Sequence, residues 1–241
     1  MNPELLFISD LHLSAKRPDA VRRFLRFLGD RARGVAAVYI LGDLFDAYIG
    51  DDDQRFPNRD VKQALRRLTA LGTRVFFQHG NRDFLVGDRF AAETGVALLG
   101  DYAVIDVHGT PTLITHGDLL CSDDIDYLRA RKRVRTAGWK QNALAKPLFA
   151  RRLYARWYRY KSGRDKSGKS AEIMDVNGAT VIETMQEYRV SRLIHGHTHR
   201  PAVHDVLLGG HGGQRFVLAE WTDRGSLLVW TPSNYRVEEV G

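Results

Sequence analysis

The sequence of 241 residues contains one cysteine, Cys121, and no long apolar stretch. A single cysteine excludes an intrachain disulfide and indicates a reducing compartment such as the cytoplasm. No apolar run approaches the roughly 18 residues that a transmembrane helix needs. Residues 1–4 lack a basic cluster and the apolar run after them ends at Ser9-Asp10, so we expect no signal peptide. We found no internal repeat, and we expect one α/β domain with an insertion, soluble or peripherally bound to a membrane.

Acidic residues are scarce in one segment of the chain. From Ile125 to Lys169 there are 15 Lys and Arg residues against only Asp126 and Asp165, whereas the remainder has 21 basic and 27 acidic residues. The net charge of +7 therefore averages a strongly basic block with an acidic remainder. Such a block indicates a module that faces a polyanion, a phosphorylated ligand or an anionic membrane surface.

Short apolar runs alternate with amphipathic stretches and predict strands that alternate with helices. Residues 5–8, 37–41 and 75–77 are typical of buried strands, and apolar residues spaced by three and four predict helices at 21–28 and 61–68. This order predicts a parallel α/β sheet with ligands at the carboxyl ends of its strands. We also expect helices at 88–93 and 173–188, a hairpin around 108–111, a strand at 192–194, a flexible connection at 209–213, and β-structure at 216–218 and 227–230.

Polar side chains follow five of the expected strands at the points where those strands end. They are Asp10 with His12, Asp43, Asn81, His116, and His195 with His197. His195 and His197 stand two apart, so in an extended chain they point the same way. A single acidic loop residue is usually a turn or a helix cap. Five such strand ends in series indicate one shared site.

The seven side chains comprise two carboxylates, one amide and four imidazoles. This is too many ligands for one ion, but it suits two first-row divalent metals that share a carboxylate. Without thiolate, the donors favour manganese, iron, cobalt or zinc in a reactive site over structural zinc. Two such ions with Asp10 and Asp43 leave a charge of about +2, which suits a phosphate group. A metal pair can activate bridging water and hold phosphoryl oxygens during in-line attack.

Several blocks of the chain resemble those of a known enzyme family. Asp10-Leu11-His12, Gly42-Asp43, Gly80-Asn81-Arg82-Asp83, His116-Gly117-Asp118 and Gly196-His197-Thr198-His199 resemble the five blocks of the calcineurin-like metallophosphoesterases. The stretch from Phe7 to about Trp221 more closely resembles the UDP-2,3-diacylglucosamine hydrolases, peripheral membrane enzymes of lipid A biosynthesis. The closer matches include residues 7–13, 49–53, 81–85, 123–124, 173–177 and 195–201. The resemblance implies an α/β fold, a β-sandwich flanked by helices, with a core at 1–124 and 170–241 and a helical cap at 125–169.

The resemblance also implies roles for single residues. Asp10, His12, Asp43 and His197 would hold one metal, and Asp43, Asn81, His116 and His195 the other, with two Mn²⁺ ions as the expected cofactor. The catalytic set would be Asp43, Asn81, Arg82 and His116. The substrate contacts would be Asn81, Arg82, Asp124, Ser162, Lys166, Lys169 and His195.

Arg82 differs from the broader superfamily, which often has a histidine at this position that assists the leaving group. Arginine is not a general acid at neutral pH, but its planar fork can bind phosphate oxygens in two places. Arg82 therefore favours a diphosphate clamp, as in the hydrolases that the chain resembles.

The basic insertion carries an apolar stripe. Phe149, Leu153 and Trp157 step by four along a cationic helix. The stripe has two interpretations: it packs the helix on the core, or it contacts acyl chains or a lipid surface. The resemblance favours a cap that holds acyl chains over the active site.

We therefore predict a hydrolase that cleaves the diphosphate of UDP-2,3-diacylglucosamine to UMP and 2,3-diacylglucosamine 1-phosphate (lipid X). We expect a monomer at the cytoplasmic face of the inner membrane, with an anionic lipid surface as partner and no nucleic acid. One alternative is a metallophosphoesterase acting on nucleic acid or another phosphodiester, with the basic aromatic insertion as a platform for single strands. Another is a non-catalytic metal-binding adaptor at anionic membranes.

Overall fold

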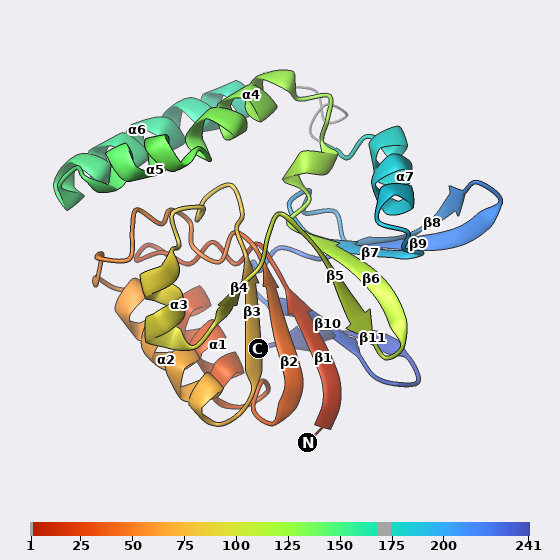
Figure 1. The fold of residues 1–241 in the computed structure, drawn as a ribbon. Coiled ribbons are helices and arrows are strands. Elements are labelled where there is room, and N and C mark those ends of the chain that lie inside the picture. The colour runs from red at the N-terminus through yellow and green to blue at the C-terminus, as the bar shows by residue number, and fades with distance from the viewer. Residues whose placement is uncertain (1, 168–174) are drawn as a thin grey trace.

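The computed structural model describes residues 2–167 and 175–241, and the side chains of residues 3–159 and 175–241. Two sheets form its centre (Figure 1). The first has the order β11 (Tyr235–Val240), β10 (Gly225–Trp230), β1 (Asn2–Ile8), β2 (Val35–Leu41), β3 (Arg74–Gln78), β4 (Ala97–Leu98). The second has the order β5 (Tyr102–Val107), β6 (Thr110–Thr115), β7 (Arg192–His195), β9 (His211–Val217), β8 (Ala202–Leu208). The central strands β1, β2 and β3 run parallel, as do β6, β7 and β9.

Alternating side chains bury both faces of the first sheet. Leu6 and Ile8 of β1 lie in one core with α1 (Pro18–Gly29), α2 (Asn58–Ala70) and α3 (Asp88–Thr94), while Leu5 and Phe7 lie in the core between the sheets. This follows from the two-residue period of a strand. The second sheet is covered by α7 (Gly178–Glu187), whose Met185 packs with Leu193. The expected β-sandwich flanked by helices is confirmed.

The basic segment forms three helices: α4 (Ile125–Val134), α5 (Ala137–Leu144) and α6 (Leu148–Ser167). They lie together beyond the carboxyl ends of β1, β2 and β3 (Figure 1). α6 is tied to the core loop at 46–53 by Arg151, whose Nη1 lies 2.8 Å from Oδ1 of Asp52, and by an ion pair between Arg159 and Asp46. No helix among the described residues is long and apolar enough to cross a membrane.

Three predictions of local structure need correction. The helix expected at 173–188 begins at Gly178, because the side chain of Asn177 accepts a hydrogen bond from the N–H of Thr180 and caps the helix. Ile173 and Met174 lie outside the described residues. The stretch 209–213 is no flexible connection: Gly209 and Gly210, both with positive φ, form the turn of a hairpin, and β9 begins at His211. The other hairpin turns at residues 108–109 alone, since Val107 pairs with Thr110.

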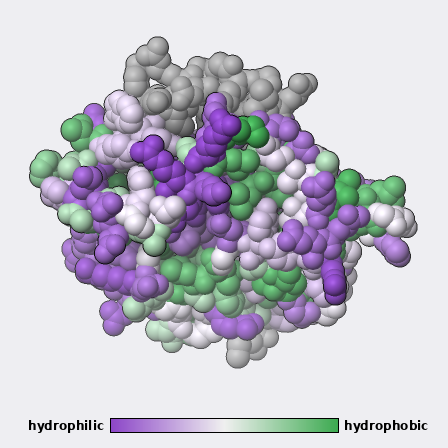
Figure 2. Space-filling model, turned by 45° about the horizontal axis from the view of Figure 1, so that its top comes forward, coloured by the Kyte–Doolittle hydropathy of each residue, from purple (hydrophilic) through white to green (hydrophobic). Residues whose placement is uncertain are grey.

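The β8–β9 hairpin projects from the body of the molecule (Figure 1), and hydrophobic surface is visible on this projection at the right of Figure 2. Leu207 of β8 is 72% exposed. β8 and β11 were not predicted, because each is an edge strand with mostly exposed side chains and lacks the buried alternation that marks a strand in sequence.

Candidate metal centre and active site

The candidate site lies where strands of both sheets end. Asp10 and His12 follow β1, Asp43 follows β2, and Asn81 follows β3 in the first sheet, whereas His116 follows β6 in the second. Carboxyl ends of parallel strands meet at one edge of a sheet. The sandwich therefore brings two such edges together.

Hydrogen bonds between the loops join the two sheets at this edge. Within the second sheet, the N–H of Gly196, after β7, donates to the carbonyl of His116 at 2.9 Å, and two further contacts reach the first sheet. The N–H of His197 donates to Oδ2 of Asp10 at 2.8 Å. Nδ1 of His116 lies 2.8 Å from the carbonyl of Leu41 in β2. The side chains at the site are therefore held in place by contacts that cross from one sheet to the other.

The backbone at the site is left-handed at five residues that have a side chain. They are Asp10 (φ 56°), His12 (φ 49°), Asp43 (φ 52°), His197 (φ 69°) and His199 (φ 56°). Among the described residues other than glycine, only His108 and Arg189 share this conformation. Each such residue costs about 1–3 kcal/mol and persists only where its surroundings impose it. The strain is thus concentrated where ligand side chains must converge.

Two groups of ligand atoms converge there. The first contains Asp10, His12 and His199, and the second Asp10, Asp43 and His116, with the ligand atoms of each group within 4.8 Å of one another. Nε2 of His199 lies 3.2 Å from Oδ1 of Asp10 and 3.5 Å from Nε2 of His12. Oδ1 of Asp43 lies 3.9 Å from Nε2 of His116. Oδ2 of Asp43 lies 3.9 Å from Nδ1 of His12, so this carboxylate stands between the two groups.

Asn81 and His197 complete the second group. Nε2 of His116 lies 3.2 Å from Oδ1 of Asn81 and 3.2 Å from Nδ1 of His197. Six of the seven predicted metal ligands are therefore close together: Asp10, His12, Asp43, Asn81, His116 and His197.

His195 is the exception, and the prediction that it faces the site is wrong. It is still part of β7, and the strand period places it on the same face as Leu193, away from the convergence point. Its Nδ1 contacts the carbonyl of Gly196 at 2.8 Å, and its Nε2 lies 3.1 Å from the guanidinium of Arg215. His195 is fully buried in this position, and its predicted contact with the substrate stays a prediction.

His199 occupies the place that His195 was expected to fill. The two-residue spacing occurs twice in this segment, as His195 with His197 and as His197 with His199. Spacing alone does not distinguish the two pairs, because either could follow the end of the strand.

The chemistry of the donor set fits divalent metal ions. Burial lowers the pKa of His12 to about 3, so its imidazole is neutral, as a metal ligand must be. Its Nδ1 is buried without a hydrogen-bond partner. Burial, with repulsion from Asp83 and Asp10, raises the pKa of Asp43 to about 7. A divalent cation bound here would favour the ionised form of Asp43.

Two glycines leave room for the carboxylates. A Cβ on Gly80 would lie 2.1 Å from Oδ1 of Asp43, and a Cβ on Gly196 would lie 2.3 Å from Oδ2 of Asp10. Any side chain at either position would displace a carboxylate of the candidate centre.

Arg82 lies between this centre and a cavity. Its Nε is buried without a hydrogen-bond partner, 3.8 Å from Oδ2 of Asp43, and its Nη1 lies 3.6 Å from Oδ1 of Asp46. The guanidinium therefore has hydrogen-bonding capacity left for an anion beside the carboxylates.

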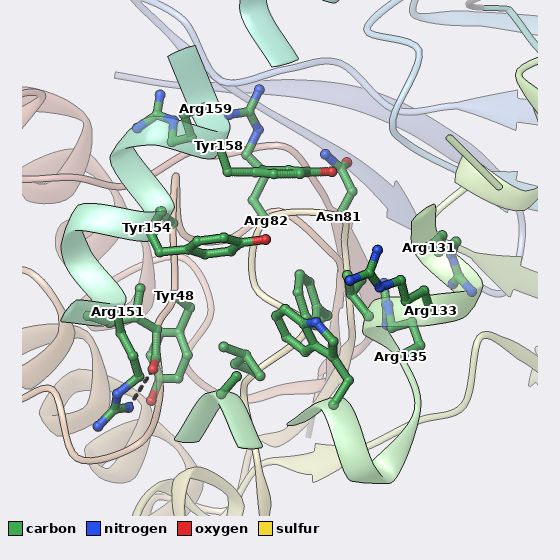
Figure 3. Close-up of a pocket in the computed structure, with 18 of the residues that line it drawn as sticks. Tyr48, Asn81, Arg82, Arg131, Arg133, Arg135, Arg151, Tyr154, Tyr158 and Arg159 are labelled. Carbon is green, nitrogen blue, oxygen red and sulfur yellow. Dashed lines mark hydrogen bonds between the residues drawn. The ribbon is translucent and has the colours of Figure 1, made fainter. Parts of the chain in front are cut away.

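The cavity of about 560 Å³ lies between helices α4–α6 and the core loops that contain Tyr48 and Asn81 (Figure 3). Figure 3 shows the rings of Tyr154 and Tyr158 extending from α6 into this space, with Arg82 and Asn81 at one side of it. Its lining is both apolar and cationic. The apolar residues include Ile49, Phe84, Leu85, Val134 and Trp139. The cationic residues are Arg82, Arg131, Arg133, Arg135, Lys146, Arg151 and Arg159. It suits a ligand with phosphate and hydrocarbon parts.

Asp124 caps α4, because its Oδ1 accepts the N–H of Tyr127 at 3.1 Å. This structural role was not predicted, and the predicted substrate contact stays a prediction. Ser162 and Lys166 lie on α6 beyond the described side chains, and Lys169 lies outside the described residues.

The comparisons with known proteins agree with this geometry. Residues 4–201 match the calcineurin-like phosphoesterase family. The chain belongs to this family. It is 48% identical over 229 residues to the UDP-2,3-diacylglucosamine hydrolase of Salmonella typhi, covering 95% of each chain. It is 46% identical over 233 residues to that of Photobacterium profundum, covering 97% of this chain and 95% of the relative.

A solved structure of an archaeal phosphodiesterase shares the fold of this calcineurin-like phosphoesterase. The TM-score is 0.50 at 12% identity, over 98% of this chain and 99% of the other.

Proposed function

We propose that this calcineurin-like phosphoesterase hydrolyses the diphosphate of UDP-2,3-diacylglucosamine to UMP and 2,3-diacylglucosamine 1-phosphate. The observation that carries the proposal is the cavity that opens on Asn81 and Arg82, beside the converging ligands, with cationic and apolar lining together. The names of relatives at 46–48% identity support the same substrate. An ordinary phosphodiesterase substrate without acyl chains would leave the apolar lining unused.

We further propose that the centre holds two divalent metal ions, with manganese as the preferred ion. Asp10, His12, Asp43 and His199 would hold one ion, and Asp43, Asn81, His116 and His197 the other, with Asp43 shared. Such a pair, when bound, supplies activated water and charge that stabilises the phosphoryl oxygens.

The protein's own groups would orient the diphosphate. Arg82 would bind two of its oxygens through the guanidinium fork, on the side of the cavity next to Asp43. The departing group is a sugar 1-phosphate, already a stable anion, so its departure needs no proton donor. Arginine at this position, in place of an acid, agrees with such a leaving group.

The segment 125–169 would serve as a cap for the acyl chains and would contact the membrane. Phe149, Leu153 and Trp157 of α6 are 72%, 69% and 54% exposed, on the helix surface away from the core. Packing of this stripe on the core is therefore not observed. We propose that the stripe inserts at an anionic lipid surface on the cytoplasmic side of the inner membrane, and that the enzyme acts as a monomer.

One incubation tests the activity. Purified protein with Mn²⁺ receives either UDP-2,3-diacylglucosamine or single-stranded DNA, and the products are separated by chromatography. We expect UMP from the first and intact strands from the second. Shortened strands without UMP would instead favour the nuclease, and neither product from a protein that binds Mn²⁺ would favour the adaptor.

A further inference from the structure

Glu220 is an acidic residue beside the candidate metal centre to which neither the sequence motifs nor the proposed function gives a role. It lies between β9 and β10, with its side chain 29% exposed. Its Oε2 lies 2.9 Å from Nδ1 of His199 and its Oε1 lies 3.9 Å from Nε2 of His12. One carboxylate thus faces two of the three side chains in the first ligand group.

The segment that carries Glu220 is anchored on both sides. The N–H of Leu218 donates to the carbonyl of His195 at 2.7 Å, and the N–H of Trp221 donates to the carbonyl of Asp10 at 3.1 Å. The Trp221 ring is fully buried and packs edge-on against Phe27. The position of Glu220 relative to Asp10 and His199 is therefore fixed by the core rather than by a mobile loop.

The two rings of His116 and His199 are held in the same manner. His116 contacts the carbonyl of Leu41 through Nδ1 and turns Nε2 to the site. His199 contacts Glu220 through Nδ1 and turns Nε2 toward Asp10. A histidine whose Nδ1–H is donated to an acceptor keeps the lone pair of Nε2 free for a metal, and a carboxylate acceptor makes that nitrogen more basic.

We infer that Glu220 is a positioning residue that orients His199 for one of the two metal ions. The inference rests on the proposed metal centre and adds a residue that does not itself touch the metal or the substrate. It predicts that loss of the carboxylate weakens the binding of one ion and leaves the affinity for the other unchanged, because His116 has its own acceptor.

The test is a Mn²⁺ titration of wild-type protein, Glu220→Ala, Glu220→Gln and the control Asp223→Asn, an exposed carboxylate of the same segment. Electron paramagnetic resonance measures free Mn²⁺ and distinguishes a coupled pair of ions from a single one, without any substrate. In Glu220→Ala we expect one ion to bind as in wild type and the Kd of the second to rise about 10–100-fold. Glu220→Gln, which retains a carbonyl acceptor, should restore part of the affinity, and Asp223→Asn should match wild type.

Two unchanged affinities in Glu220→Ala would overturn the role of Glu220 while leaving the metal centre intact. Equal weakening of both ions together with a lower melting temperature of the metal-free protein would show a merely structural role. A wild-type protein that binds fewer than two ions would overturn the metal centre itself, and this inference with it.

Discussion

At the scale of single residues, His195 and His199 lie in one short segment but face different surroundings. Nε2 of His199 points to Asp10, whereas Nε2 of His195 points to Arg215. We expect His199→Ala to lose one metal ion and on the order of 10³-fold or more in kcat/KM, because metal charge stabilisation is worth several kcal/mol.

His195→Gln should instead bind two ions and lose about 1–3 kcal/mol of stability, from the disturbed buried contacts. Elemental analysis together with thermal melting separates the two cases. The reverse pattern would restore His195 as a ligand.

Asp43 has opposite effects on stability and on metal binding. Its pKa is raised from the ordinary 3.8 to about 7, so the folded state holds a proton that the unfolded state has released at intermediate pH. Stability of the metal-free protein should therefore fall as pH rises from about 4 to 7 because of this group.

Asp43→Asn mimics the protonated form, so metal-free Asp43→Asn should melt at a higher temperature than wild type at pH 8 and at a similar temperature near pH 4. It should also fail to bind two Mn²⁺ ions. Equal melting temperatures of wild type and Asp43→Asn at pH 8 would show that burial and neighbouring charges do not destabilise the ionised carboxylate.

Arg82 tests the geometry of the diphosphate contact. Arg82→Lys keeps the charge but loses the fork, so kcat/KM should fall by an amount corresponding to about 1.5–3 kcal/mol. Metal content should stay at two ions, because Arg82 is not a ligand. Unchanged kcat/KM would exclude a clamp of two contacts.

Residue chemistry was largely predictable from sequence, whereas orientation was not. Strand ends predicted which polar residues meet, and six of the seven ligands predicted from the sequence do meet. The choice between His195 and His199 depended on where β7 ends and on left-handed φ values at His197 and His199, which a sequence does not display. Glu220 had no local motif, since its contact with His199 depends on tertiary structure.

At the scale of elements, α6 has two faces with different environments. Phe149, Leu153 and Trp157 point outward, whereas Tyr154 and Tyr158 line the cavity. Trp157→Ala and Leu153→Ala should lower the amount of protein that sediments with lipid vesicles, and should lower kcat/KM for the lipid substrate. The loss of binding free energy should be on the order of 25 cal/mol for each Å² of apolar surface that the lipid no longer buries. Neither should change turnover of a short UDP-sugar analogue without acyl chains.

Tyr158→Ala is the matched variant on the cavity face of α6. It should lower kcat/KM for the lipid without lowering sedimentation. Equal losses on lipid and analogue in Trp157→Ala would mean that this residue only maintains the helix layer.

Helices and central strands followed from hydrophobic periodicity, because burial on one or both faces imposes it. The edge strands β8 and β11 did not, since their exposed side chains carry little of that pattern. The helix α7 was predicted too long at its start, because Asn177 caps it where no break in the apolar pattern occurs.

At the scale of the whole molecule, bound metal should stabilise the fold. Asp10 and Asp43 are buried close together, so removal of metal by a chelator leaves their repulsion uncompensated. Ligands that bind only the folded state add about 2.7 kcal/mol at 100 times Kd. Melting curves with Mn²⁺ and with EDTA should differ by several degrees, and the difference should disappear in Asp43→Ala.

Because the centre lies where two sheets meet, neither a fragment of the chain nor a single exchanged sheet can carry it alone. β1–β3 and the loops after them lie before residue 88, while β6, β7 and the loops after them lie after residue 109. Each half of the chain therefore carries ligands that are useless alone. Co-expressed fragments should regain metal binding only when the apolar layer containing Phe7 and Ile194 reassembles. Recombination that exchanges one sheet for a relative's has to preserve that layer as strictly as the ligands.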